Sequence, residues 1–304
     1  MRAQFLSAPL LIAVVAIAMG SSIDALVKGV APSAGLHHLL AWRFLFGALI
    51  SLAVFRAQQR PRPGWPAIRF HSMRGIIQVA AAWTFFYALM HLPLAVATII
   101  GFTAALMVPF VARILIGERI TPIAMVATII GFAGAALAVT GRPDTGTASE
   151  YWVLGTVSCF LAAFLYALIL VMLRMRATQE DATTIAMFTN TVPAIILLPV
   201  TFGVFGAPDW SDIPLFLMFG ALGYAVWFLM TLAYARAPAQ RLAPLEYTAL
   251  LWSGLFGSVF FAEYPGWQTW LGAAVIVAAC LIVAFEGKFA TRKATGMPVS
   301  DLPE

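Results

Sequence analysis

Apolar residues run through this chain in ten continuous stretches, which are separated by short polar segments. A helix that crosses the hydrocarbon core of a bilayer needs about 20 such residues. The stretches lack the alternating pattern of membrane-barrel strands, so only helices fit them. The pattern therefore predicts an all-α integral membrane protein with ten transmembrane helices. We place these helices at 7–30, 36–55, 72–90, 94–113, 121–140, 152–173, 183–205, 213–235, 242–262 and 268–286.

The positions of the basic residues support this count. If the N-terminus is cytoplasmic and ten helices alternate in direction, Arg142 is the only lysine or arginine in an outer segment. Lys28 and Arg43 fall within spans, and the rest of the 18 lysines and arginines fall in inner segments. Positive charge concentrates in the cytoplasmic loops of membrane proteins. We therefore expect a multi-pass protein of the cell inner membrane with both termini in the cytoplasm.

The overall composition excludes several other classes of protein. Hydrophobic residues make up 62% of the chain and charged residues only 10%, and the mean hydropathy is +0.92. A soluble domain has about half apolar and about a quarter charged residues. A soluble enzyme, a disordered chain and a nucleic-acid-binding domain are thereby excluded. The two cysteines, Cys159 and Cys280, lie inside apolar stretches, which excludes a disulfide scaffold.

Two short motifs occur in the same order in both halves of the chain. A Thr-x-x-Tyr-Ala segment stands at 84–88 and at 231–235, and a small residue followed by glutamate stands at 117–118 and at 262–263. Each half then holds five predicted helices. Because five is odd, the second half must enter the membrane upside down relative to the first. Inverted repeats of this kind are a transporter architecture, with the substrate site near the midplane between them.

With these two repeats, the chain consists of four parts. We expect a first five-helix repeat at 1–140, an outer linker at 141–151, a second five-helix repeat at 152–287 and a cytoplasmic tail at 288–304. The linker segment is rich in glycine, proline and small polar residues, which are typical of loops. The sequence carries no signal for an oligomeric state.

A family resemblance rests on motifs in both halves. The second predicted helix contains Ala41-Trp42-Arg43-Phe44, and the fourth runs from Pro109 to Gly117-Glu118. The second half adds Ala262-Glu263 and Leu271-Gly272. Over 7–287 the chain resembles the EamA-type branch of the drug/metabolite transporter superfamily, including its amino-acid exporters. The resemblance implies export of small metabolites by alternating access, with no enzymatic step.

The second half departs from the first at two points of this pattern. Gly254 stands where the first half has Pro109, and the seventh predicted helix has no clear partner for Arg43, with Asn190 as the nearest polar residue.

Ionisable groups inside spans are costly and are therefore candidates for function. Asp24 and Lys28 are four residues apart on one helix face. They are either an ion pair at the outer interface, or a gate or substrate-ammonium contact. Arg43 either ties its helix to a neighbour or binds substrate. Glu246 follows the helix-disrupting Pro244 and is a proton carrier, an ammonium contact or an interfacial residue.

Aromatic residues placed away from both interfaces predict a roomy, largely apolar cavity with a few hydrogen-bonding groups. Gly20-Ser21-Ser22 predicts a break in the first helix at mid-depth, where backbone groups can meet a zwitterion. Polar and aromatic residues of several helices are thus the candidate substrate-binding residues. They are Ser22, Trp83, Tyr87, Thr98, Phe102, Tyr166, Tyr224, Trp227, Glu246 and Trp252.

Together these features predict an inner-membrane exporter of hydrophobic or aromatic amino acids and related small metabolites, which works by alternating access. Its expected partners are the substrate and the lipid bilayer. The alternative is a broad exporter of lipophilic cations, with Glu246 as the buried anion. An intramembrane enzyme is disfavoured because it needs histidines or carboxylates clustered at mid-depth, and all four histidines lie outside the predicted spans or at their ends. A channel is disfavoured as well.

No phosphate-binding loop or metal-ligand spacing occurs in the sequence, so we expect neither a cofactor nor direct use of ATP. Facilitated diffusion and proton exchange both stay open.

Overall fold

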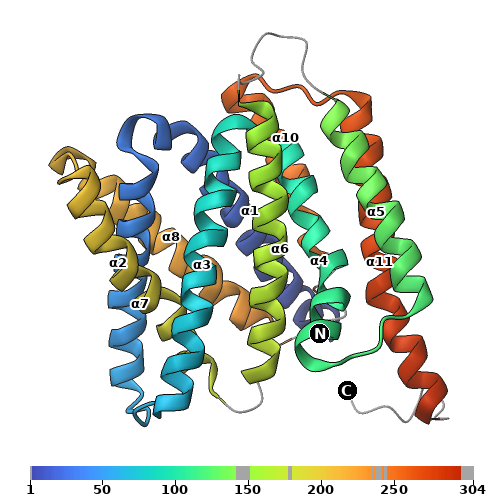
Figure 1. The fold of residues 1–304 in the computed structure, drawn as a ribbon, viewed down its shortest axis with the longest axis horizontal. Helices are drawn as coiled ribbons and strands as arrows, with labels where there is room; N and C mark the ends of the chain where they lie inside the picture. The colour runs from blue at the N-terminus through green and yellow to red at the C-terminus, as the bar shows by residue number, and fades with distance from the viewer. Residues whose placement is uncertain are drawn as a thin grey trace.

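The computed structural model describes residues 2–141, 151–176, 180–234, 236, 242 and 245–295. These residues form helices and connections, with no strand among them. Figure 1 shows the helices side by side as one bundle. They are α1 (Arg2–Ala34), α2 (Leu36–Ala57), α3 (Trp65–His91), α4 (Leu94–Ile116), α5 (Pro122–Thr140), α6 (Trp152–Arg176), α7 (Ala182–Val200), α8 (Ile213–Tyr234), α10 (Ala249–Phe261) and α11 (Trp267–Thr295). A π-helical turn (Thr201–Phe205) extends α7, and a 3-10 turn (Trp210–Asp212) precedes α8.

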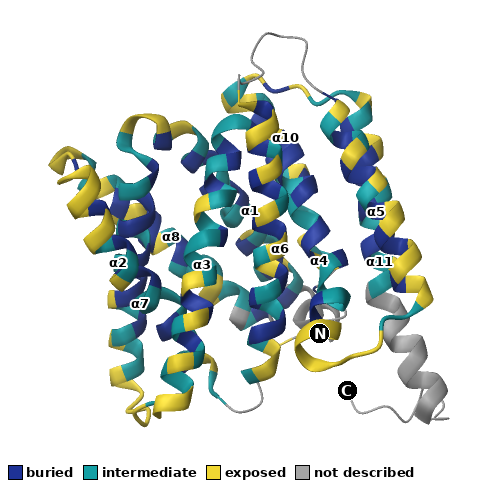
Figure 2. Ribbon diagram, in the orientation of Figure 1, coloured by how far each residue is buried: buried dark blue, intermediate teal, exposed yellow. Residues whose placement is uncertain are grey.

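These helices coincide one for one with the predicted spans, although α10 covers only Ala249–Phe261 of the predicted 242–262. Among the described residues, eight helices are long and apolar enough to cross a membrane. Two shorter apolar segments, Ala249–Phe261 of α10 and Trp267–Val283 of α11, complete the set. Exposed residues occur along the length of many helices (Figure 2), and large apolar residues such as Ile114, Ile129 and Val153 are among the exposed ones. Such side chains are suited to contact with lipid tails.

The helix contacts confirm the predicted inverted repeat. If α1 to α5 correspond in order to α6, α7, α8, α10 and α11, three of the contacts between the two repeats occur twice. The packing of α3 on α6 is matched by α8 on α1, that of α4 on α6 by α10 on α1, and that of α2 on α8 by α7 on α3. The pairs α2–α7, α4–α10 and α5–α11 are each related to themselves. The fold is therefore two five-helix units related by an approximate two-fold axis.

Both repeats end their fourth helix in the same unusual way. The residue after α4 is Gly117, with φ 72°, and the residue after α10 is Ala262, with φ 53°. Both values lie in the left-handed region, in which helices often terminate. The repeated small-residue–glutamate motif is thus a helix end followed by an acidic side chain, Glu118 or Glu263.

The ends of the bundle can be told apart in Figure 1, where α1 begins at the lower end and α11 finishes there. We call this the lower end; it also holds the α2–α3, α4–α5 and α6–α7 connections. The opposite, upper end holds the α1–α2, α3–α4 and α10–α11 connections.

Two sequence expectations about local structure are wrong. Helix α1 continues through Gly20-Ser21-Ser22 without a break, and the Ser22 hydroxyl donates to its own helix at the Met19 carbonyl (2.7 Å). Helix α3 begins at Trp65 rather than at 72, which places His71 inside a helix. Helix α11 continues beyond the predicted span 268–286, to Thr295. Most of the predicted linker (142–150) and the end of the tail (296–304) lie outside the described residues.

Candidate functional site

A cavity of about 320 Å³ lies among the first repeat and α6. Its lining comes from the middle of α3 and α6 and from neighbouring turns of α1, α2 and α4. Most of the lining is apolar or aromatic, and a few residues carry charge or hydrogen-bonding groups. The lining residues are Asp24, Arg43, Gln78, Ala81, Ala82, Phe85, Phe86, Thr98, Gly101, Phe102, Ala162, Ala163 and Tyr166.

Opposite charges face this cavity from two helices. Asp24 of α1 and Arg43 of α2 attract each other electrostatically. Neither makes a hydrogen bond or a salt bridge within 4.0 Å to any other described residue, and the Nε–H of Arg43 is buried without a partner. A buried donor without a partner costs about 1–3 kcal/mol. The pair is therefore open to an added ligand that carries both charges.

Aromatic rings lie beside Arg43 and along the cavity wall. The Arg43 guanidinium lies 4.8 Å from the ring centre of Phe44 and 5.9 Å from that of Phe86, both within cation–π range. Phe102 meets Tyr247 edge to face, with ring centres 5.2 Å apart. The cavity thus combines a charged end with apolar walls.

A second set of charged contacts lies on the upper side of the cavity lining. The Lys28 ammonium lies 2.6 Å from the Glu263 carboxylate and donates to the Leu92 carbonyl. The other oxygen of Glu263 accepts from the Leu94 N–H (2.8 Å). The expected pairing of Asp24 with Lys28 is therefore wrong, because Glu263 takes the ammonium and Asp24 faces the cavity instead.

Of the predicted substrate-binding residues, Thr98, Phe102 and Tyr166 line the cavity. Trp83 and Tyr87 do not. They stack on each other (5.5 Å), and the Trp83 indole donates to His37 at 3.4 Å in a row of rings near the upper end.

The remaining predicted residues lie elsewhere in this structure. Tyr224 stacks on Phe228 (6.4 Å), and Trp227 is exposed on the same helix, α8. Trp252 of α10 is partly buried, and its indole N–H has no partner among the described residues. Glu246 is exposed just before α10, so the cavity anion is Asp24 rather than Glu246.

Sequence reasoning missed a buried polar cluster near the lower end. His71 is fully buried and pairs with Glu180, which also lies 3.6 Å from Arg176. Arg74 is buried beside it and donates to the Thr189 hydroxyl (2.7 Å). The cluster ties α3 to the α6–α7 connection and to α7. The expectation that every histidine lies outside the spans or at their ends is wrong for His71, which lies inside α3.

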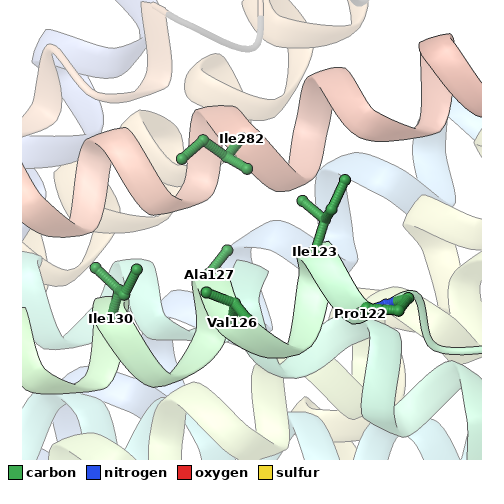
Figure 3. Close-up of a pocket in the computed structure, with 6 residues that line it drawn as sticks. All are labelled: Pro122, Ile123, Val126, Ala127, Ile130 and Ile282. Carbon is green, nitrogen blue, oxygen red and sulfur yellow. The ribbon is translucent and has the colours of Figure 1, made fainter.

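An apolar groove of about 260 Å³ lies between α5 and α11 (Figure 3). Its lining is aliphatic, with Ile123, Val126 and Ile130 of α5 opposite Ile282 of α11. Nothing in this lining can bind a polar group. Among the described residues, no three His, Cys, Asp or Glu side chains cluster as a metal site requires.

Comparisons with known proteins agree with this architecture. Residues 6–140 and 153–285 match the EamA-like transporter family, with one match for each repeat. A crystal structure that is 21% identical superimposes with a TM-score of 0.62 over 93% of this chain and 99% of that chain, which shows a shared fold.

Three curated relatives are transporters of different small molecules. The S-adenosylmethionine uptake transporter of Rickettsia bellii is 25% identical, over 83% of this chain and 84% of that protein. The riboflavin transporter of Brucella anthropi is 26% identical, over 83% and 89%. The pseudopaline exporter of Pseudomonas aeruginosa is 24% identical, over 92% and 97%.

Proposed function

The chain belongs to the EamA-like transporter family, and on that premise we propose that it exports hydrophobic or aromatic amino acids and related small zwitterions by alternating access. The family and the three relatives are transporters rather than enzymes. The relatives differ in substrate and include both uptake and export proteins. What we propose beyond family membership is therefore the substrate and the direction of transport.

The observation that carries the proposal is the pair of opposite charges in the cavity. An amino acid presents a carboxylate and an ammonium group at one end of the molecule. Arg43 offers an unpaired guanidinium N–H for the carboxylate, and Asp24 offers a carboxylate for the ammonium group. Such hydrogen bonds between charged groups are about twice as strong as neutral ones. A zwitterion satisfies both side chains at once.

The walls and the size of the cavity fit the rest of such a substrate. Phe85, Phe86 and Phe102 provide apolar surface for a side chain. The volume of about 320 Å³ lies at the small end of ligand pockets, which range over about 300–1,000 Å³. S-adenosylmethionine, the substrate named for the first relative, also carries an amino-acid group and belongs in any substrate screen.

The distribution of charge supports a cytoplasmic lower end. Arg60, Arg119 and Arg176 stand in or beside the connections at this end, whereas Asp209 and Glu263 stand in those of the upper end. By the positive-inside rule the lower end faces the cytoplasm. Both chain termini then lie in the cytoplasm of the cell, and the protein is an inner-membrane exporter.

Counter-flow in proteoliposomes tests the proposal. Vesicles loaded with unlabelled phenylalanine are expected to accumulate labelled phenylalanine transiently, and the Arg43→Gln and Asp24→Asn variants are expected to lose at least about 90% of this signal. Arg56→Gln is the matched control, because Arg56 lies on the same helix but is exposed at its lower end. Full counter-flow in both cavity variants would contradict the assignment.

A lipophilic-cation exporter is the second candidate, and Asp24 in the cavity is the observation that favours it. Competition between tetraphenylphosphonium and phenylalanine separates the two functions. Removing the positive charge with Arg43→Gln is expected to abolish phenylalanine transport. For a cation exporter, the same change would raise tetraphenylphosphonium transport instead.

A further inference from the structure

The two ends of the bundle carry the same ion pair, once in each repeat. At the upper end Lys28, in α1, pairs with Glu263, which follows the last residue of α10 by two positions (2.6 Å). At the lower end Arg174, in α6, pairs with Glu118, which follows the last residue of α4 by two positions (2.8 Å). Because α1 corresponds to α6 and α10 to α4, the two pairs are repeat-related.

The local backbone supports this equivalence. Each glutamate directly follows a left-handed residue, Gly117 at one end and Ala262 at the other. Each cation lies near the C-terminal end of the first helix of its repeat. The inverted repeat therefore places one such contact on each side of the membrane.

The two pairs differ greatly in burial. The side chains of Lys28 and Glu263 are 13% and 9% exposed, whereas those of Arg174 and Glu118 are 62% and 44% exposed. An exposed pair contributes little to stability, but removing one partner of a buried pair is strongly unfavourable. In this structure the upper pair therefore holds its end far more firmly than the lower pair does.

The upper pair also holds a third element in place. Lys28 donates to the Leu92 carbonyl, and Glu263 accepts from the Leu94 N–H, on either side of the α3–α4 turn. The ammonium lies 5.7 Å from the ring centre of Phe261 at the end of α10. The pair therefore joins α1, the α3–α4 turn and the end of α10.

These contacts lie directly above the cavity. Lys28 stands one helical turn beyond the cavity residue Asp24 on α1. Leu94 stands one turn before the cavity residue Thr98 on α4, and the Thr98 hydroxyl donates to the Leu94 carbonyl (2.9 Å). Lys28 itself and the Leu94 N–H that Glu263 binds are thus each one turn from the cavity lining, on its upper side.

We propose that the Lys28–Glu263 pair is a latch that shuts the cavity at the upper end, and that Arg174–Glu118 is its repeat-related counterpart at the lower end. The two latches are buried in turn: opening the upper end separates Lys28 from Glu263, and closing the lower end buries Arg174 against Glu118. This inference rests on the proposed function, since it assumes transport through this cavity.

The test measures access to the cavity and needs no substrate. In a Cys159→Ala, Cys280→Ala background, Ala82→Cys places a thiol in the cavity lining. A membrane-impermeant maleimide is applied to membrane vesicles of each orientation. Glu263→Gln removes the charge of the upper latch but keeps an oxygen for the Leu94 N–H. Glu118→Gln makes the identical change in the lower latch and is the matched control.

We expect Glu263→Gln to raise the labelling rate from the upper side at least about tenfold, a change of about 1.4 kcal/mol in the opening equilibrium. Glu118→Gln is expected to leave that rate unchanged or to lower it. An unchanged upper-side rate in folded Glu263→Gln protein would overturn the latch, as would an equal rise in Glu118→Gln.

A second variant covers the case in which Glu263→Gln does not fold because it leaves the buried Lys28 ammonium without its anionic partner. If Glu263→Gln does not yield folded protein, the Lys28→Met, Glu263→Gln double variant removes both charges and is expected to show the same tenfold rise. A wild-type rate in the folded double variant would reject the latch. Because labelling does not depend on the substrate, failed counter-flow with normal gating would refute the amino-acid assignment and leave the latch standing.

Discussion

The crossing of α5 and α11 offers a test of the scaffold that holds the two repeats together. At this crossing a Cβ atom added to Gly272 would lie 2.4 Å from the Gly134 carbonyl oxygen and 2.8 Å from the Ala138 nitrogen. Both contacts are to backbone atoms of α5, which cannot move aside by a change of rotamer. The change Gly272→Ala must therefore push the two helices apart.

The expected cost follows from two opposing effects. Replacing glycine by alanine inside a helix ordinarily gains about 1 kcal/mol. Overpacking a close contact costs about 1–3 kcal/mol, and the backbone collisions at Gly272 put the change at the high end of this range. We expect a net loss of about 1–2 kcal/mol in the free energy of unfolding.

Thermal unfolding in detergent measures this effect, with Gly20→Ala as the matched control. Gly20 also lies within a helix, but its nearest neighbour is the Val226 Cγ1 atom at 4.0 Å, so a methyl group fits there. Gly272→Ala is expected to melt below the wild type and Gly20→Ala at or above it. Because α5 and α11 contribute nothing to the cavity lining, folded Gly272→Ala protein should still transport. Melting of Gly272→Ala at or above the wild-type temperature would show that the two helices do not pack as described.

Two further predictions concern helix ends. Ala262→Gly is expected to raise the free energy of unfolding by about 1 kcal/mol, since a left-handed conformation (φ 53°) costs an alanine about 1–2 kcal/mol. Gly117→Ala, with open space around the residue, is expected to lower the free energy of unfolding by a similar amount. If the two variants melted at the same temperature, these left-handed helix ends would be contradicted. Asp181 accepts hydrogen bonds from the Thr183 and Thr184 N–H groups at the start of α7. Burial raises the pKa of Asp181, but the hydrogen bonds from Thr184 and the nearby Arg60 lower it by more. The pKa of Asp181 therefore lies below its ordinary value. This stabilisation is present at neutral pH and is lost as the pH falls through the lowered pKa, so the deficit of Asp181→Ala, about 1 kcal/mol at pH 7, should disappear in acid. A deficit that persists unchanged at pH 2 would contradict that role.

Hydropathy and charge were sufficient to predict the architecture. The apolar stretches have the length that a bilayer demands, and the odd number of helices per half forces the second half to be inverted. Local errors arose where polar residues belong to a helix. The segment 65–71 contains Arg69 and His71 and reads as a loop, yet its helix buries His71 against Glu180, more than 100 residues away. No local sequence pattern predicts Glu180 as the partner of His71.

The lining of the cavity was predicted only in part, because a periodic pattern identifies one face of a helix but not the helix that packs against it. Thr98, Phe102 and Tyr166 were found because α4 and α6 turn those residues to the cavity. Trp227 satisfies the same kind of pattern on α8 but is exposed. The partner of Lys28 was missed for a related reason. Asp24 is nearer in sequence, but Glu263 also satisfies the Leu94 N–H at the start of α4.

The two repeats are alike in the ion pairs at their ends and unlike in the groups that face the cavity. Asn190 of α7 is the nearest polar counterpart of Arg43. Its amide donates to the Ala186 carbonyl (3.0 Å), and its oxygen lies against Gly47 of α2, where an added Cβ would be 2.4 Å away. Asn190 is thus occupied by helix packing, and the charged pair of the cavity comes from the first repeat alone. Paired latches require both halves, whereas a single zwitterion needs one cation and one anion, so the first repeat alone can supply the charges that bind it.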